Sequence, residues 1–197
     1  MNNSEFEIAI SFHGHQCPAM PLGFRAAEFA MQTLGVSRSQ DKELYVIAET
    51  GNNHAAGCFL DGIMSATGCT YGKSNIEKTY YNKMAFTLID RQTNRAVRVR
   101  LKDDFLKNIL QSPFVKERKS GVLPQDISPE ITQPLVQKVR TIEPASFLEV
   151  GEIYSHPIAS KTSCFDTDLC TSCGERLFAN GLTNGRCQSC QNKEQNG

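Results

Sequence analysis

Two pairs of cysteines near the C-terminus constrain the fold of this chain more than any other feature. Cys170 and Cys173 form the first C-x2-C pair, "CTSC", and Cys187 and Cys190 form the second, "CQSC", thirteen residues later. Each pair aims two thiolates at one point, and two pairs complete a tetrahedral four-thiolate site that suits zinc. The intervening "RLFANGLTNGR" contains Asn-Gly twice, which is a hairpin signal. The spacing therefore predicts a zinc ribbon.

The length of the chain, 197 residues, fits one ordinary domain with a small appendage. A tail of about 30 residues buries too little core to fold alone, so its metal would be its structural staple. The stretch "HPIASKTSCFDTD" is polar and irregular. We therefore expect a core domain at residues 1–160 and a four-cysteine zinc-ribbon domain at residues 161–197.

Other uses of the four ribbon cysteines are less well supported. Two disulfides would require an oxidising compartment, and a thioredoxin-like C-x-x-C would occur once. An iron site shares the same spacing and stays open. Acidic and basic residues nearly balance in the tail, which gives nucleic-acid binding little electrostatic support. A structural or partner-docking module is the expectation.

The charge and the hydrophobic pattern narrow the function classes further. Lys plus Arg and Asp plus Glu both number 21, so no net charge draws the chain to nucleic acid or to an anionic membrane. The sequence has no apolar run of membrane-spanning length, and "MNNSEFEIAI" lacks the features of a secretory signal. We expect a cytoplasmic protein whose eight cysteines are reduced and serve metal binding or chemistry.

Periodicity in the first 155 residues predicts a mixture of helices and strands. The surest feature is an antiparallel hairpin in "KMAFTLIDRQTNRAVRVRLK", where Met84, Phe86 and Leu88 alternate with polar residues. We further expect a strand at residues 44–50 and helices at residues 21–35, 52–68, 103–114 and 128–144. This pattern favours an α+β core, with the hairpin and flanking helices, over a doubly wound parallel sheet. The basic side chains of the hairpin form a solvated strand face or a surface for an anionic partner; they are Arg91, Arg95, Arg98, Arg100 and Lys102.

Histidine and cysteine also gather at two places in the core. In "FHGHQC", His13, His15 and Cys17 would share one face of an extended segment. In "NNHAAGCFLD", the spacing of i, i+4 and i+7 would place three more side chains on one helix face; they are His54, Cys58 and Asp61. Three hypotheses stay open at this point: a metal site with an open position, a Cys–His nucleophilic pair, and buried structural residues.

One further stretch, "TGCTYGKS", imitates a phosphate-binding loop without matching it. Gly68 and Gly72 are separated by three residues, where the Walker motif has four, and a helix is expected before the stretch instead of after it. Lys73 could still hold an anion. A helix-to-strand turn with a surface lysine is the favoured interpretation.

Three segments together resemble the FmdE family, which takes its name from the FmdE component of formylmethanofuran dehydrogenase: "FHGHQCPAMPLGFRAA", "GCFLDGIMSATGCTYGKSN" and the four-cysteine tail. The resemblance covers residues 8–155 and the ribbon, with Ala19 where the family usually has Gly. It implies an α+β core that forms an intertwined homodimer and an association with a molybdenum or tungsten enzyme of one-carbon metabolism. It also implies a second divalent metal in the core, expected to be zinc, on His15, Cys17 and Cys58. The reserve ligands are His13, His54 and Cys69.

Three functions are compatible with these features. The first is a metal-binding accessory or regulatory protein, whose ribbon provides structure and docks a partner. The second is a metal-dependent enzyme acting on a small substrate, with Asp61 or His13 as the acid–base group and Lys73 holding an anion. The third, a nucleic-acid-binding regulator, is disfavoured by the neutral tail. Within the first function, we expect His13 to orient the metal ligands.

Overall fold

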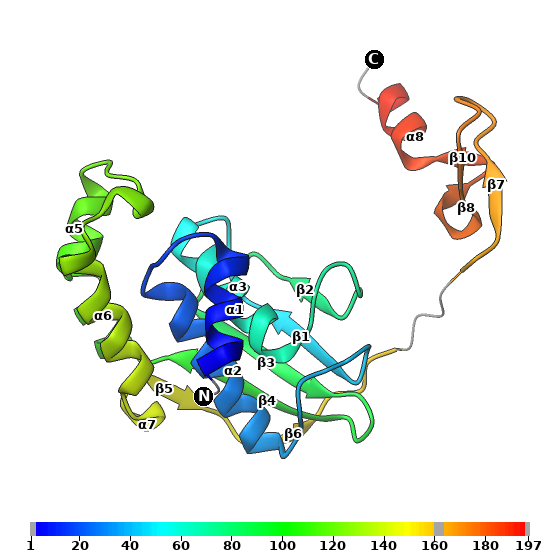
Figure 1. The fold of residues 1–197 in the computed structure, drawn as a ribbon. Helices are drawn as coiled ribbons and strands as arrows, with labels where there is room; N and C mark the ends of the chain where they lie inside the picture. The colour runs from blue at the N-terminus through cyan, green and yellow to red at the C-terminus, as the bar shows by residue number, and fades with distance from the viewer. Residues whose placement is uncertain (1–2, 160–163, 196–197) are drawn as a thin grey trace. The chain divides into compact units, whose positions relative to one another are not determined.

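The structure, a computed structural model, describes residues 3–159 and 164–195 (Figure 1). The chain divides into two compact units, residues 1–158 and residues 159–197. The predicted domain boundary between residues 160 and 161 lies outside the described residues. Each unit is described by itself below.

The first unit is built on one mixed β-sheet whose strand order is β2-β1-β3-β4-β5, with β6 pairing beside β5 on β4. The strands are β1 (Leu44–Ala48), β2 (Ile76–Lys78), β3 (Ala85–Asp90), β4 (Arg95–Leu101), β5 (Leu148–Val150) and β6 (Tyr154–Ser155). β1 and β2 are parallel, and the remaining pairs are antiparallel. The hairpin predicted from alternation is β3–β4, with Phe86 opposite Val99. The α+β prediction is confirmed.

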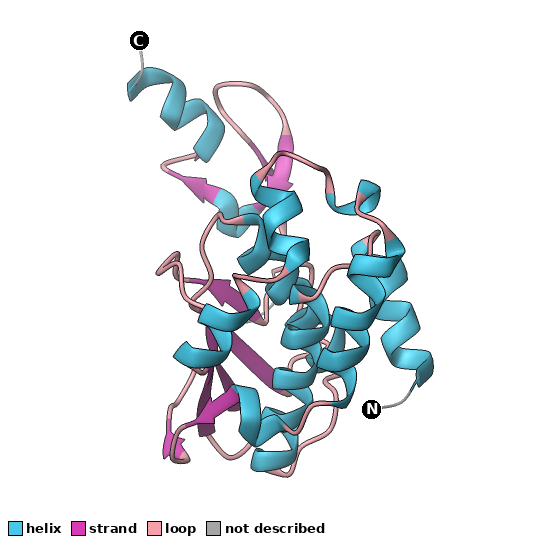
Figure 2. Cartoon of the chain, turned by 90° about the vertical axis from the view of Figure 1, so that its left-hand side faces the viewer, coloured by secondary structure: helices cyan, strands magenta, loops and turns pink. Residues whose placement is uncertain are grey.

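A layer of helices packs on this sheet (Figures 1 and 2). The helices are α1 (Asn3–His13), α2 (Ala19–Leu34), α3 (His54–Thr67), α4 (Asp103–Ile109), α5 (Pro113–Lys119), α6 (Pro129–Thr141) and α7 (Pro144–Phe147), with a 3-10 turn at Pro124–Asp126. α2 contacts β3 and β4 directly, and α3 packs against both α2 and α1. Fully buried side chains such as Phe24, Phe59 and Phe86 fill the space between the layers.

The contact between α2 and α3 depends on two glycines. A Cβ atom on Gly23 would lie 1.9 Å from the carbonyl oxygen of Phe59, and one on Gly62 would lie 2.1 Å from that of Met20. The two backbones therefore touch at these positions, which no larger residue allows. This close approach fixes the loop that precedes α2 against the first turns of α3.

Two features of the helical layer differ from the sequence prediction. α1 was not predicted, because its apolar residues form no clear stripe, and Ile8 and Phe12 are exposed. The single helix expected at residues 103–114 ends at Ile109, and α5 begins anew at Pro113. The Ser112 hydroxyl accepts a hydrogen bond from the Val115 N–H, so Ser-Pro here starts a helix.

The basic side chains of β4 are bound within the first unit. The guanidinium of Arg98 pairs with Glu49, and that of Arg100 pairs with Glu149. The guanidinium of Arg95 donates to the carbonyl oxygen of Leu34. These pairings favour the strand-face interpretation over a surface for an anionic partner. Among the described residues, none of the helices has the length and hydrophobicity needed to span a membrane.

The second unit is a small β-rich domain. Its elements are β7 (Thr167–Leu169), β8 (Arg176–Phe178), a 3-10 turn (Ala179–Gly181), β9 (Leu182–Thr183), β10 (Arg186–Cys187) and α8 (Gln188–Gln195). β7 pairs with β8 and β9 pairs with β10, both antiparallel. Asn184 and Gly185 connect β9 to β10 with φ values of 52° and 77°, as a type I′ hairpin turn requires. The other predicted Asn-Gly lies in the 3-10 turn.

Candidate metal centres

Four side chains converge at the end of α1 and the start of α3. His13 is the last residue of α1, His15 and Cys17 lie in the loop that follows, and Cys58 lies in α3. One potential ligand atom from each of the four lies within 4.8 Å of all the others. Gly14 makes this possible, because its φ of 88° turns the chain sharply after α1. Sequence segments 41 positions apart, counted from Cys17 to Cys58, thus form one group.

His13 is held in place by a carboxylate. Its Nδ1 lies 2.8 Å from Oδ2 of Asp61, and its side chain is only 4% exposed. Its Nε2 lies 3.5 Å from Sγ of Cys17. The hydrogen bonds from Asp61 and Cys17 raise the pKa of His13 to about 9. The Asp61 carboxylate therefore leaves Nε2 directed at the group, an arrangement that proteins commonly use to orient a metal-binding imidazole.

The two thiols of the group are buried and interact with each other. Cys17 is 4% exposed and Cys58 is 3% exposed. A hydrogen bond from Cys58, with further ones from His13 and His15, holds the pKa of Cys17 well below its usual value. The same contact and burial raise the pKa of Cys58. The metal-free group therefore favours one thiolate next to one thiol.

The imidazole of His15 contributes the observation that points most directly to a ligand. Its Nε2 is buried and has no hydrogen-bond partner among the described residues. A buried polar atom without a partner is costly and calls for an explanation. A metal ion bound by His15, His13, Cys17 and Cys58 would provide one, because two thiolates and two imidazoles form a donor set that suits zinc. The residues present therefore fit the ion.

The other candidate residues from the sequence have different positions. His54 lies next to the group, with its ring centroid 5.7 Å from that of His15, but it is exposed and is not a member. Cys69 is fully buried outside the group, and burial raises its pKa to about 11. The ammonium of Lys73 donates to the carbonyl oxygens of Ser39 and Gln40, which leaves it poorly placed to hold an anion.

The structure therefore changes the roles expected for two residues. His13, expected to orient the ligands, lies in the group with a nitrogen directed at Cys17. Asp61, expected as an acid–base group, orients His13. The i, i+4, i+7 spacing in α3 placed Asp61 on the same helix face as Cys58, but it carried no information on which α1 side chain would meet it.

The second group consists of the four ribbon cysteines, whose ligand atoms also lie within 4.8 Å of one another. Sγ of Cys173 lies 4.0 Å from Sγ of Cys187. The backbone N–H groups of Cys187 and Cys173 lower the pKa of Cys170 to about 6. Hydrogen bonds with neighbouring sulfurs raise the pKa of Cys190 to about 12. A dication would favour the thiolate form of all four residues, so this cluster fits a zinc ribbon.

Comparison with known proteins places these groups in a family context. Residues 12–148 match the model of a family described as FmdE, molybdenum formylmethanofuran dehydrogenase operon. A protein of Archaeoglobus fulgidus, named as a probable S-adenosyl-L-methionine-binding protein, is 28% identical over 92% of this chain. The match spans 51% of that relative, so the chain corresponds to about half of its length.

A solved structure shares the fold. It is an FmdE-like protein of the tungsten formylmethanofuran dehydrogenase type from Syntrophus aciditrophicus, with a TM-score of 0.60 and 21% sequence identity. The match covers 96% of this chain and 92% of the other. Both FmdE-type motifs and the architecture of the chain therefore have counterparts in known proteins.

Proposed function

The chain belongs to the FmdE family, and from this premise we propose that it is a metal-binding accessory or regulatory protein. The core group of His13, His15, Cys17 and Cys58 holds one divalent ion, zinc by its donor set. The ribbon cysteines hold a second, structural zinc. The observation that carries the proposal is the buried, unpartnered Nε2 of His15 among two thiols and a second imidazole.

The number of ligands favours an accessory role over catalysis. A catalytic zinc usually has three protein ligands and keeps a fourth position open for water or substrate. The sequence led us to expect three ligands here, whereas the structure gathers four. Four protein ligands close a tetrahedral site, which suits a structural or sensing ion.

X-ray absorption spectroscopy at the zinc edge tests this proposal. A variant with Cys173→Ser and Cys190→Ser confines the signal to the core site, and we expect two sulfur and two nitrogen neighbours there. Metal analysis should give about two zinc ions per wild-type chain, one for each group. Loss of one ion on Cys17→Ala with Cys58→Ala is expected. An unchanged count would exclude the core site, and an oxygen neighbour would favour the enzyme alternative.

The assembly of the protein is a second part of the proposal. We propose a cytoplasmic homodimer, because the family resemblance implies a dimer and thiolate sites are stable where cysteines stay reduced. Light scattering after size exclusion should give twice the chain mass of 21.9 kDa. A monomer at micromolar concentration would contradict the dimer without affecting the metal sites.

The partner of the ribbon is proposed to be a protein of a molybdenum or tungsten enzyme system. Two observations support this: the description of the family names such an operon, and the ribbon exposes apolar side chains, among them Phe165 and Phe178. Affinity purification from the native host should recover a component of that enzyme with the wild-type chain. Recovery should fail with a Phe178→Ser variant that retains its ribbon zinc.

A further inference from the structure

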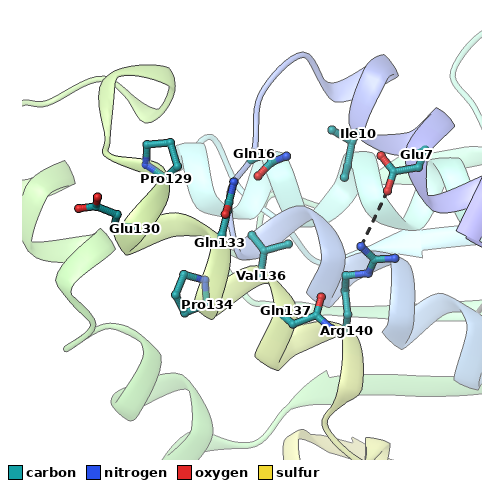
Figure 3. A pocket seen from close by; sticks show the side chains of 10 residues that line it. All are labelled: Glu7, Ile10, Gln16, Pro129, Glu130, Gln133, Pro134, Val136, Gln137 and Arg140. Atoms are coloured by element: carbon teal, nitrogen blue, oxygen red, sulfur yellow. Dashed lines mark ion pairs between the residues drawn. The ribbon is translucent and has the colours of Figure 1, made fainter.

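A pocket of about 450 Å³ lies between α1 and α6, next to the loop that carries His15 and Cys17 (Figure 3). Glu7 and Ile10 line it from α1, and Gln16 lines it from the loop. Its volume is within the range of about 300–1,000 Å³ that is typical of ligand sites. The metal group uses the residues on either side of Gln16, so the pocket and the group share one loop.

The walls of the pocket are fixed by the surrounding structure. The guanidinium of Arg25 in α2 donates to the last carbonyl oxygens of α6, including those of Val139 and Arg140, at 3.0 Å each. Arg140 in turn lies 3.8 Å from the carboxylate of Glu7 and 4.5 Å above the ring of Phe6. These contacts join α6 to α1 and α2 at one end, so the opposite wall exists before any ligand binds.

Three carboxamide side chains line the other end of the pocket. They belong to Gln16 of the loop and to Gln133 and Gln137 of α6, and Figure 3 shows Gln16 and Gln133 near each other across the gap. In the part of the chain that the structure describes, none of these carboxamides has a hydrogen-bond partner. Each offers both a donor and an acceptor, the same pair that a peptide group displays.

The charges around the pocket restrict what it can bind. Two carboxylates face it, those of Glu7 and Glu130, against the single guanidinium of Arg140. That guanidinium already pairs with Glu7, whose side chain stays 64% exposed. A phosphate or carboxylate ligand would be repelled, whereas a cationic side chain would be attracted. Ile10 and Val136 add apolar surface.

We propose that this pocket docks a short peptide segment that carries a lysine or arginine side chain. The peptide groups bind to Gln16, Gln133 and Gln137, and the basic side chain lies between Glu7 and Glu130. Docking requires only the fold of the first unit, so it can be measured whether or not the core group holds a metal.

Nuclear magnetic resonance titration of the full chain tests the proposal. The probes are acetyl-Ala-Lys-Ala-amide, acetyl-Ala-Glu-Ala-amide and, as a neutral heterocycle, adenine. We expect the lysine peptide to shift the side-chain amide signals of Gln16, Gln133 and Gln137 in a saturable way, and the glutamate peptide to bind more weakly. The double variant Gln133→Leu, Gln137→Leu should raise the Kd by about tenfold, through the loss of two hydrogen bonds.

Two control variants sharpen the test. Gln125→Leu, an exposed glutamine outside the pocket, should leave the Kd unchanged. Glu130→Gln should remove most of the preference for the lysine peptide. The proposal is overturned if the lysine peptide does not saturate, if the glutamate peptide binds equally well, or if the double variant binds like the wild type. Binding of adenine alone would also overturn it and would indicate a site for a small heterocycle.

Discussion

The Nδ1 of His13 lies 2.8 Å from the Oδ2 of Asp61, although 48 positions separate the two residues in the chain. The carboxylate fixes the imidazole so that Nε2 is directed at Cys17. We predict that Asp61→Asn lowers the affinity of the core site for zinc by about 10- to 100-fold, the usual effect of losing such a partner. Competition with a chromophoric chelator measures this affinity.

A matched control for this prediction is Asp104→Asn in α4. The Asp104 side chain is 96% exposed and contacts only Lys107 at 3.8 Å, so its loss should leave zinc affinity unchanged. An Asp61→Asn variant with wild-type affinity would show that His13 is not a ligand or does not need to be oriented.

The protonation of His13 and Cys17 predicts an unusual pH dependence in the metal-free protein. Between the unperturbed pKa values of 6.5 for His and 9.0 for Cys, the unfolded chain holds one proton on Cys17. The folded chain holds one proton on His13 instead, because the pKa of His13 is raised to about 9 and that of Cys17 is lowered. The proton counts are equal, so this pair gives the free energy of unfolding no slope there.

Cys17→Ser should reveal the contribution of His13. Asp61, the largest cause of the shift, still raises the His13 pKa, so the folded variant binds one proton that the unfolded chain lacks. The stabilisation is complete below pH 6.5 and is lost as the pH rises through the folded pKa, with a slope of up to about 1.4 kcal/mol per pH unit. Urea unfolding from pH 6 to 9 with chelator measures it. Cys69→Ser, outside the group, should keep the wild-type slope; the same slope in Cys17→Ser would contradict the proton assignment.

Sequence patterns predicted the elements of the fold better than their contacts. Alternation located β3 and β4, and Gly35 and Gly68 marked the ends of α2 and α3, where both adopt positive φ. The membership of His13 in the metal group could not be derived in this way. It depends on α1, whose side chains form no periodic stripe, and on the left-handed turn at Gly14. Which side chains converge is a property of the packing of α1, α2 and α3, which local periodicity does not encode.

The glycine contact between α2 and α3 predicts a sharp difference between two substitutions in α3. Gly62→Ala places a methyl group 2.1 Å from the carbonyl oxygen of Met20, and backbone atoms cannot yield cheaply. We expect a loss of about 3 kcal/mol in the free energy of unfolding, the upper part of the usual range for overpacking. Urea denaturation provides the measurement, and zinc uptake by the core group should weaken as the helices separate.

Gly57→Ala is the matched control on the same helix. No atom lies within 4 Å of a Cβ at position 57, so Ala should stabilise α3 by up to about 1 kcal/mol through its higher helix propensity. If both substitutions had equal effects, close approach of the two backbones would not be the reason for Gly62.

The ribbon cysteines predict that the second unit depends on its metal and the first does not. Cys173→Ser removes one of four thiolates, and a unit with so small a core should then unfold. Hydrogen exchange with mass spectrometry should show loss of protection at residues 167–195 and unchanged protection in α2, α3 and β3. Cys164→Ser changes a cysteine of the same unit that lies outside the group, and it should leave both patterns intact. Loss of protection in the core as well would show that the two compact units do not fold independently.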